Sequence, residues 1–147
     1  MNWIATHDYF GLWANHPDVT DQVRTNANTL LVAVNGLMEK AFDDGVDFPL
    51  NPTTKSRVAG HEFGGFRPQC CTQGAPQSSH KVGKAVDVYD GKVEDGQPFA
   101  TWCLNNQDVL QAHGLYMEHP TATKGENTCW CHLTTRAPKS GRRCFYP

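Results

Sequence analysis

Two short segments of the chain carry side chains that could do chemistry together. In the first, residues 78–87, His80 stands seven residues before Asp87 and leads into a predicted strand. In the second, residues 128–133, His132 lies on another predicted strand. Imidazoles and carboxylates ligate metal ions and transfer protons. Each segment by itself, however, predicts only a surface loop entering a strand or a structural histidine on a half-exposed strand.

Taken together, the two segments resemble the M15 family of zinc D-Ala-D-Ala carboxypeptidases and phage endolysin endopeptidases. The family pattern Ser-x-His-x-x-Gly-x-Ala-x-Asp is matched from Ser78 to Asp87. The pattern Trp-x-His near the C-terminus is matched by Trp130 and His132. The resemblance therefore joins the two segments into one expected site.

The resemblance extends beyond these motifs. Residues 65–68, Gly-Phe-Arg-Pro, look like the family's Ser-Gly-Tyr-Arg-Pro segment, with Gly64 in place of the serine. Residues 132–147 are similar to the ending of small phage members. In all, the resemblance covers roughly residues 20–147.

What the resemblance implies is a single zinc ion held by His80, Asp87 and His132. Two imidazoles and a carboxylate leave the fourth tetrahedral position to water, as in catalytic zinc sites. The ion would lower the pKa of that water and polarise the scissile carbonyl. Arg67 is the candidate for gripping a substrate carboxylate or a developing oxyanion, because its planar fork can bind two oxygens. A plain surface arginine beside a proline is the alternative for this residue.

A hydrolase of this kind also needs a general base, and here the chain departs from part of the family. Many members carry a glutamate three residues before the last histidine, where this chain has Cys129. Glu118 is the favoured substitute, because a hairpin that turns near Gly125 would place it directly opposite His132 and on the same face. Glu126, six residues before that histidine, is the second candidate, but it falls in the turn.

The elements that must position these residues are one long helix followed by short strands and an inserted helix. Apolar residues recur at spacings of three and four between residues 20 and 44, which predicts a buried helical face. Strands are predicted at 85–89, 115–119 and 128–134. A helix is predicted at 98–113, with a break left open at its two adjacent asparagines. We therefore expect an α+β fold with an antiparallel sheet, helices packed against it, and the zinc site on the sheet.

Length and composition indicate one ordinary soluble globular domain, residues 1–147, with 39% hydrophobic and 19% charged residues. The formal net charge of -2 gives no case for a nucleic-acid or membrane partner. No stretch approaches a membrane span, and the N-terminus lacks the features of a secretory signal. We expect a monomer that is made in the cytoplasm without a signal peptide and acts at the bacterial cell wall after release.

Cysteine and aromatic residues add two smaller expectations. Most of the six cysteines are predicted to be buried, reduced thiols, although one oxidised pair is left open. Trp3, Phe10 and Trp13 are expected to close the hydrophobic core, with a sugar-stacking patch as the alternative.

The function expected from the resemblance is zinc-dependent hydrolysis of peptide bonds in the stem peptides of peptidoglycan. The enzyme would be an endolysin-type endopeptidase or a D-Ala-D-Ala carboxypeptidase, and its partner is the peptide substrate. Two alternatives belong to other classes. One is a non-catalytic zinc-binding structural or wall-binding module, and the other is a disulfide-stapled binding domain without a metal.

Overall fold

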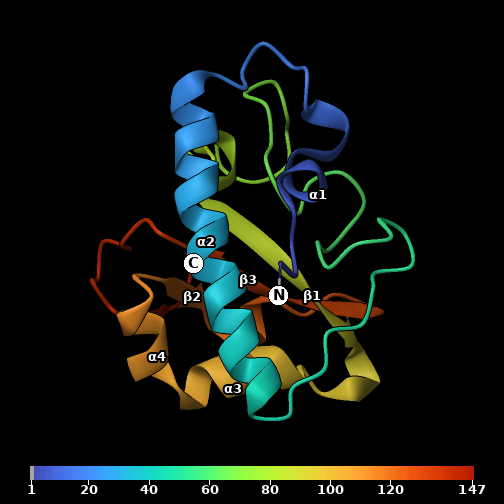
Figure 1. Ribbon diagram of the computed structural model, residues 1–147, viewed down its shortest axis with the longest axis vertical. Coiled ribbons are helices and arrows are strands. Elements are labelled where there is room, and N and C mark those ends of the chain that lie inside the picture. The colour runs from blue at the N-terminus through green and yellow to red at the C-terminus, as the bar shows by residue number, and fades with distance from the viewer. Residues whose placement is uncertain (1) are drawn as a thin grey trace.

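A long helix crosses the molecule in the computed structural model, which describes residues 2–147 (Figure 1). This helix, α2, spans Asp21–Asp43, close to the predicted 20–44. The hydroxyl of Thr20 accepts a hydrogen bond from the backbone N–H of Val23 at 3.2 Å and so caps the first turn. One face of α2 is buried, as its apolar spacing predicted. The buried residues of this face are Val23, Ala27, Leu30, Leu31, Val34, Leu37, Met38 and Ala41.

Four strands form one sheet in the order β1-β3-β2-β4. They are β1 (Ala85–Lys92), β2 (Tyr116–Glu118), β3 (Thr128–Thr134) and β4 (Cys144–Phe145). β3 pairs antiparallel with both β1 and β2, whereas β2 and β4 pair in parallel. The expectation of an antiparallel sheet is therefore wrong at β4. Because β2 already occupies the antiparallel place beside β3, the chain turns back after β3 and pairs with the far edge of β2 in the same direction as β2.

The two faces of the β1–β3 pair have different roles. Val86 and Val88 of β1 and Cys131 and Leu133 of β3 belong to the hydrophobic core, together with the buried face of α2. Figure 1 shows α2 lying across the front of the sheet. Side chains alternate between the two faces of a strand. Intervening residues such as Asp87 therefore point to the face away from this core.

The predicted helix at 98–113 is two helices, α3 (Pro98–Asn105) and α4 (Gln107–Ala112). The break comes at Asn106, whose backbone angles (φ -132°, ψ 47°) are not helical. The carboxylate of Asp90 accepts hydrogen bonds from two backbone N–H groups in the first turn of α3, at 2.8 and 2.9 Å. Burial raises the pKa of Asp90 to about 6, and these two donors oppose the rise. The end of β1 thus caps the start of α3.

The N-terminal segment closes one end of the core. It forms α1, Thr6–Phe10. Trp3 and Phe10 are buried and Trp13 packs against the core, so the core-closing expectation is confirmed. The hydroxyl of Tyr9 donates a hydrogen bond to the carbonyl oxygen of Ala85 at 2.9 Å, which ties this segment to the start of β1. Short 3-10 turns lie at Gly11–Trp13, Ser79–Val82, Val93–Asp95 and Pro120–Ala122.

All six cysteines are free thiols. Cys103, Cys129 and Cys131 are buried, whereas Cys70 is exposed and the remaining two are half-buried. The expectation of mostly buried thiols therefore holds for three of the six. Burial raises the pKa of Cys129, so this thiol stays protonated at neutral pH.

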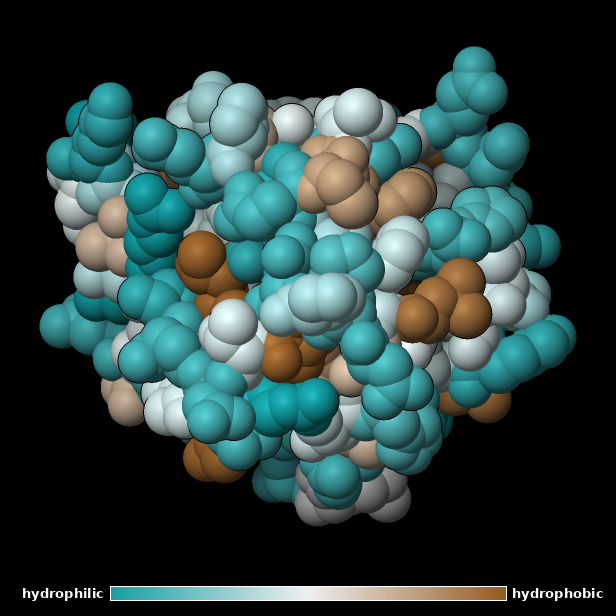
Figure 2. Space-filling model, turned by 90° about the horizontal axis from the view of Figure 1, so that it is seen from above, coloured by the Kyte–Doolittle hydropathy of each residue, from teal (hydrophilic) through white to brown (hydrophobic). Residues whose placement is uncertain are grey.

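The face of the molecule that Figure 2 shows is largely hydrophilic. Figure 2 shows the end of the molecule that is uppermost in Figure 1, and its hydrophobic groups are small and separated by hydrophilic ones. Scattered apolar side chains of this kind are normal on a protein surface. Among residues 2–147, no helix combines the length and the apolar character that crossing a membrane requires.

Candidate metal centre

His80, Asp87 and His132, called the triad below, lie together and are buried. Each residue offers one ligand atom, and these atoms lie within 4.8 Å of one another. Asp87 on β1 is paired directly with His132 on β3, so both side chains leave the sheet on the same face. His80 reaches them from the 3-10 turn that precedes β1. The triad is therefore built from two neighbouring strands and the loop that leads into one of them.

The ligand atoms of the triad point toward one another. The Nδ1 atom of His132 lies 2.9 Å from Oδ1 of Asp87, and the Nε2 atom of His80 lies 3.4 Å from the same oxygen. The Nδ1 atom of His80 lies 2.8 Å from the carbonyl oxygen of Gly65. A carbonyl only accepts, so this Nδ1 carries a proton, and Nε2 is the ring nitrogen that faces Asp87. Such an outer hydrogen bond fixes the tautomer and orientation of a metal-binding histidine.

Charges within the triad shift the pKa values of its members. Burial by itself would raise the pKa of Asp87, but His80 and His132 outweigh it and hold this pKa well below its usual range. Burial would lower the pKa of His132, but the hydrogen bond and charge of Asp87 more than offset this and raise it, with a further contribution from Glu118. Positive charge beside Asp87 is therefore favourable, and either a protonated imidazole or a metal ion can supply it. Two imidazoles and a carboxylate that converge in this way fit a divalent metal ion.

Backbone hydrogen bonds from residues 64–67 hold the triad in place. The carbonyl oxygen of Gly64 accepts a hydrogen bond from the N–H of Asp87 at 2.7 Å, and the N–H of Arg67 donates to the carbonyl oxygen of His80 at 3.2 Å. Together with the Gly65 carbonyl, these bonds fix two of the three ligands. The likeness of residues 64–68 to a family segment predicted a role here. The backbone nature of that role was not predictable from residue types.

Glu118 lies on the same face of the sheet as the triad. β2 and β3 pair Tyr116 with Thr134 and Met117 with Leu133, so the next step of this register sets Glu118 opposite His132. This is the register that the expected hairpin required. Glu118 is half-buried and lines a hollow of about 570 Å³, called the triad hollow, together with the three triad residues.

The other positions considered for the base lie elsewhere. Glu126 is exposed in the loop before β3 and is not among the residues that line the triad hollow. Cys129 is buried, and strand alternation places it on the face of β3 opposite to His132. Of the two glutamates considered for the base, Glu118 therefore lines the triad hollow and Glu126 does not.

Arg67 lies beside the triad, as expected, but much of its guanidinium is already engaged. Its Nε donates a hydrogen bond to the carbonyl oxygen of Phe63 at 2.6 Å, and its Nη2 lies 3.4 Å from Oδ2 of Asp87. The side chain is only 13% exposed. A guanidinium has five N–H donors, so donors remain that can face the triad hollow, which Arg67 also lines.

Two aromatic residues of the site, Phe145 and Trp130, were given no role of their own from the sequence. The ring of Phe145 on β4 lies 6.4 Å from the ring of His132, at 90° to it. Trp130 is half-buried and lines the triad hollow and a second hollow that Asp87 also lines. Phe145 could have been found only by placing β4 beside β2, which needs the sheet topology.

Gly65→Ala is expected to destabilise the fold and disturb the triad. A Cβ at Gly65 would overlap the backbone carbonyl oxygen of Tyr9, so one of two backbone segments has to move. We expect the free energy of unfolding to fall by about 1–3 kcal/mol or more, the usual cost of overpacking. Chemical denaturation measures this change. Gly125→Ala is the milder comparison, because its Cβ would lie 3.2 Å from the backbone oxygen of Thr128, a tight contact that needs only a small shift, and an equal loss in both variants would contradict the prediction.

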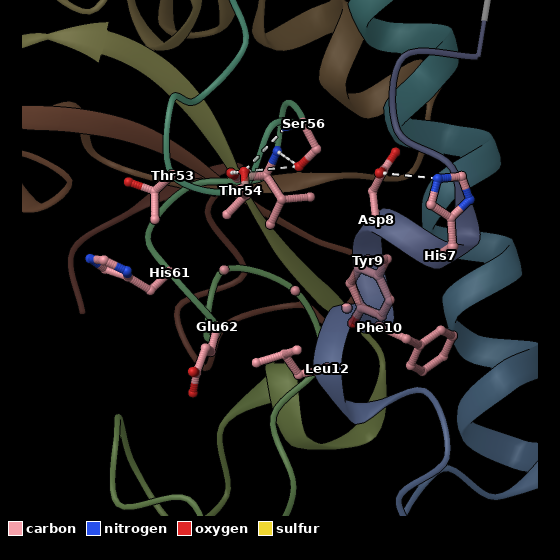
Figure 3. Close-up of a pocket in the computed structure, with 14 residues that line it drawn as sticks. His7, Asp8, Tyr9, Phe10, Leu12, Thr53, Thr54, Ser56, His61 and Glu62 are labelled. Carbon is pink, nitrogen blue, oxygen red and sulfur yellow. Dashed lines mark hydrogen bonds and ion pairs between the residues drawn. The ribbon is translucent and has the colours of Figure 1, made fainter.

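A further hollow of about 460 Å³ lies beside α1 and is drawn in Figure 3. Some of its polar side chains pair with one another: Thr54 and Ser56 share a hydrogen bond of 3.0 Å, and His7 lies 3.3 Å from Asp8. His61 lines this hollow and also the second hollow beside Asp87. Within residues 2–147, the triad is the only group of three or more His, Cys, Asp or Glu residues whose ligand atoms converge. Among the described residues, the triad is therefore the candidate metal site.

Comparison of the chain with protein-family models, curated proteins and solved structures finds no match in any of the three. The M15 resemblance rests on the motifs in residues 64–68, 78–87 and 130–132. What it implies for activity is therefore a proposal, supported by the geometry of the triad.

Proposed function

We propose that this protein is a zinc-dependent peptidase that hydrolyses peptide bonds in peptidoglycan stem peptides, as an endolysin-type endopeptidase or a D-Ala-D-Ala carboxypeptidase. The observation that carries the proposal is the buried convergence of His80, Asp87 and His132 at the wall of an open hollow that Glu118 shares. Zinc is the proposed ion because three ligands of this type, with a position left to solvent, characterise catalytic zinc sites.

When bound, a zinc ion would lower the pKa of a water molecule and polarise the scissile carbonyl as a Lewis acid. The chain's own residues supply the rest of the chemistry. Glu118 takes a proton from the attacking water and returns it to the leaving amine. Arg67 donates hydrogen bonds to the oxygen that becomes negative in the transition state. The Gly65 carbonyl keeps the imidazole of His80 in the required orientation.

The second candidate is a non-catalytic zinc-binding structural or wall-binding module. The cysteine at position 129 favours it, because many M15 members have a glutamate there. The two candidates share the metal and differ in the need for Glu118. In the enzyme this carboxylate is indispensable for turnover, whereas in a structural module its removal leaves function unchanged.

We also propose the oligomeric state, the location and the partner of the peptidase. The peptidase acts as a monomer on the bacterial cell wall after its release from the cytoplasm, and the wall peptide is its partner.

Digestion of purified peptidoglycan by the zinc-loaded protein tests the proposal. We expect soluble fragments with new amino groups, and mass spectrometry of these fragments identifies the bond that is cut. Protein treated with a chelator is the control and should release none. Zinc binding without release of fragments from any wall type would favour the non-catalytic module, and absence of zinc binding would contradict both candidates.

Metal removal is expected to lower stability. An ion that binds only the folded chain stabilises it by about 2.7 kcal/mol when its free concentration is a hundred times Kd. The melting temperature should therefore rise with added zinc and fall with a chelator, because the triad forms only in the folded state. Differential scanning calorimetry measures the shift. A zinc-induced rise that persisted in His132→Ala would place the ion elsewhere.

A further inference from the structure

The triad hollow has a positively charged wall that the proposed chemistry does not use. Beyond the triad, the hollow is lined by the segment that follows β3, including Arg136, Pro138 and Lys139. Arg136 and Lys139 are both exposed. Neither Arg136 nor Lys139 takes part in the ion pairs between side chains of residues 2–147.

Arg136 is held in place at this wall. Its Nη1 donates a hydrogen bond to the carbonyl oxygen of Gln77 at 2.9 Å, and its backbone N–H donates to the hydroxyl of Thr134 at 3.0 Å. The first bond joins the segment after β3 to the loop before the triad, across the hollow. The remaining N–H groups of the guanidinium are available to a ligand. A positioned guanidinium loses less conformational entropy on binding than a free one.

Arg67 is a poorer choice for binding an anionic group of a substrate. Its side chain is 13% exposed, its guanidinium donates to the carbonyl oxygen of Phe63, and it lies next to the carboxylate of Asp87. It lines both the triad hollow and the second hollow. Arg136 and Lys139, by contrast, line only the triad hollow. The exposed positive charge outside the triad therefore belongs to the triad hollow alone.

The acidic residues are distributed in a complementary way. In the triad hollow the acidic residues are Asp87, which belongs to the triad, and Glu118, opposite His132. The second hollow carries Glu62 in its wall. The exposed cations thus line the triad hollow, whereas the second hollow carries an acidic residue in their place. A peptide whose free carboxylate lies in the triad hollow matches this distribution of charge.

We infer that the triad hollow selects peptides that carry a free carboxylate on the side of Arg136 and Lys139, and that these two residues bind it. The inference rests on the proposed peptidase function and names its substrate class. It also divides two roles that the sequence assigned to Arg67 alone. Arg67 serves the developing oxyanion, and Arg136 and Lys139 serve the substrate carboxylate. Two cations that line one hollow suit a carboxylate, since Arg binds it with two parallel N–H bonds.

A stem peptide offers this carboxylate from two sources, the C-terminal α-carboxylate and the α-carboxylate of its γ-linked D-glutamate. The probes are therefore four forms of L-Ala-γ-D-Glu-L-Lys-D-Ala-D-Ala: both groups free, either one amidated, or both amidated. Kd is measured by calorimetry with zinc-loaded Glu118→Gln protein, which is not expected to turn the peptides over. We expect the fully free form to bind about tenfold more tightly than the doubly amidated form, the effect of losing two exposed charge contacts. If amidation of only one of the two carboxylates removes this tenfold advantage, that carboxylate is the group that Arg136 and Lys139 bind.

Substitutions then assign the selectivity to the two residues. Adding Arg136→Gln and Lys139→Gln together should abolish the difference between free and amidated peptides. Arg136→Lys, which keeps the charge, should retain most of it. Arg142→Gln is the matched control, because Arg142 is exposed in the same segment but does not line the triad hollow. Thermal unfolding checks that the variants are folded.

Equal affinity for all four peptides, no binding of any of them, or a preference that survives in the double variant would overturn the inference. Hydrolysis of the same peptides by the wild-type protein separates this failure from that of the proposed function. Hydrolysis without preference for a free carboxylate overturns only the inference. Carboxylate-selective binding without hydrolysis overturns only the proposed function.

Discussion

Replacing His132 by alanine is expected to remove metal binding and hydrolysis together. The imidazole is one of three converging ligands, and it also donates to Asp87 when no metal is present. Loss of partners that only orient a ligand costs metal sites 10- to 100-fold in affinity. Loss of the ligand itself should therefore cost at least about 100-fold. Zinc content after dialysis and turnover of peptidoglycan measure the two effects in parallel.

Two further variants separate loss of the ligand from loss of the fold. His132→Ala leaves the buried carboxylate of Asp87 without one hydrogen-bond donor, which costs about 1–3 kcal/mol. His132→Asn can keep a donor near this carboxylate, so it should be more stable than His132→Ala. His61→Ala is the control, because His61 is exposed and lines neighbouring hollows. Full zinc content in a folded His132→Ala protein would rule out the triad as the metal site.

The elements with strong local signals were predictable from sequence. The apolar spacing of α2 and the threonine before it define one long helix, because a buried stripe and an N-cap are both local features. β1 and β3 were predicted from alternation and apolar content. The pairing of Asp87 with His132 follows once these strands are adjacent. The expectation of a metal site at these residues came from the family motifs.

Non-local pairing was not predictable in the same way. β4 is two residues long and pairs in parallel with β2, and so short a strand carries no periodic signal. Gly64 and Gly65 act on the triad through their carbonyl groups, which every residue type possesses, and the close backbone contacts that exclude a Cβ at both positions arise only in the folded chain. The wall formed by Arg136 and Lys139 depends on how the segment after β3 returns across the hollow. In each case the information lies in the topology of the sheet and not in the local sequence.

Glu118→Gln is expected to abolish most turnover while the metal and the fold are retained. Glutamine has nearly the same shape as glutamate but cannot accept the proton of the attacking water. Removal of a positioned general base typically lowers rates by about 10²- to 10⁴-fold. Because this base acts in the transition state, the loss should appear in kcat, with KM little changed. Steady-state kinetics on a soluble stem peptide measures both constants.

The metal separates this result from a general loss of structure. Glu118 is not one of the three ligands, so Glu118→Gln should bind zinc as the wild type does and show the same zinc-induced rise in melting temperature. Glu126→Gln is the matched control and should keep wild-type kcat, because Glu126 is exposed outside the triad hollow. If Glu126→Gln lost turnover and Glu118→Gln kept it, the loop before β3 would have to move to the triad during catalysis. If neither substitution mattered in an active, zinc-dependent enzyme, the proton would have to be taken by a group outside both strands of the β2–β3 pair.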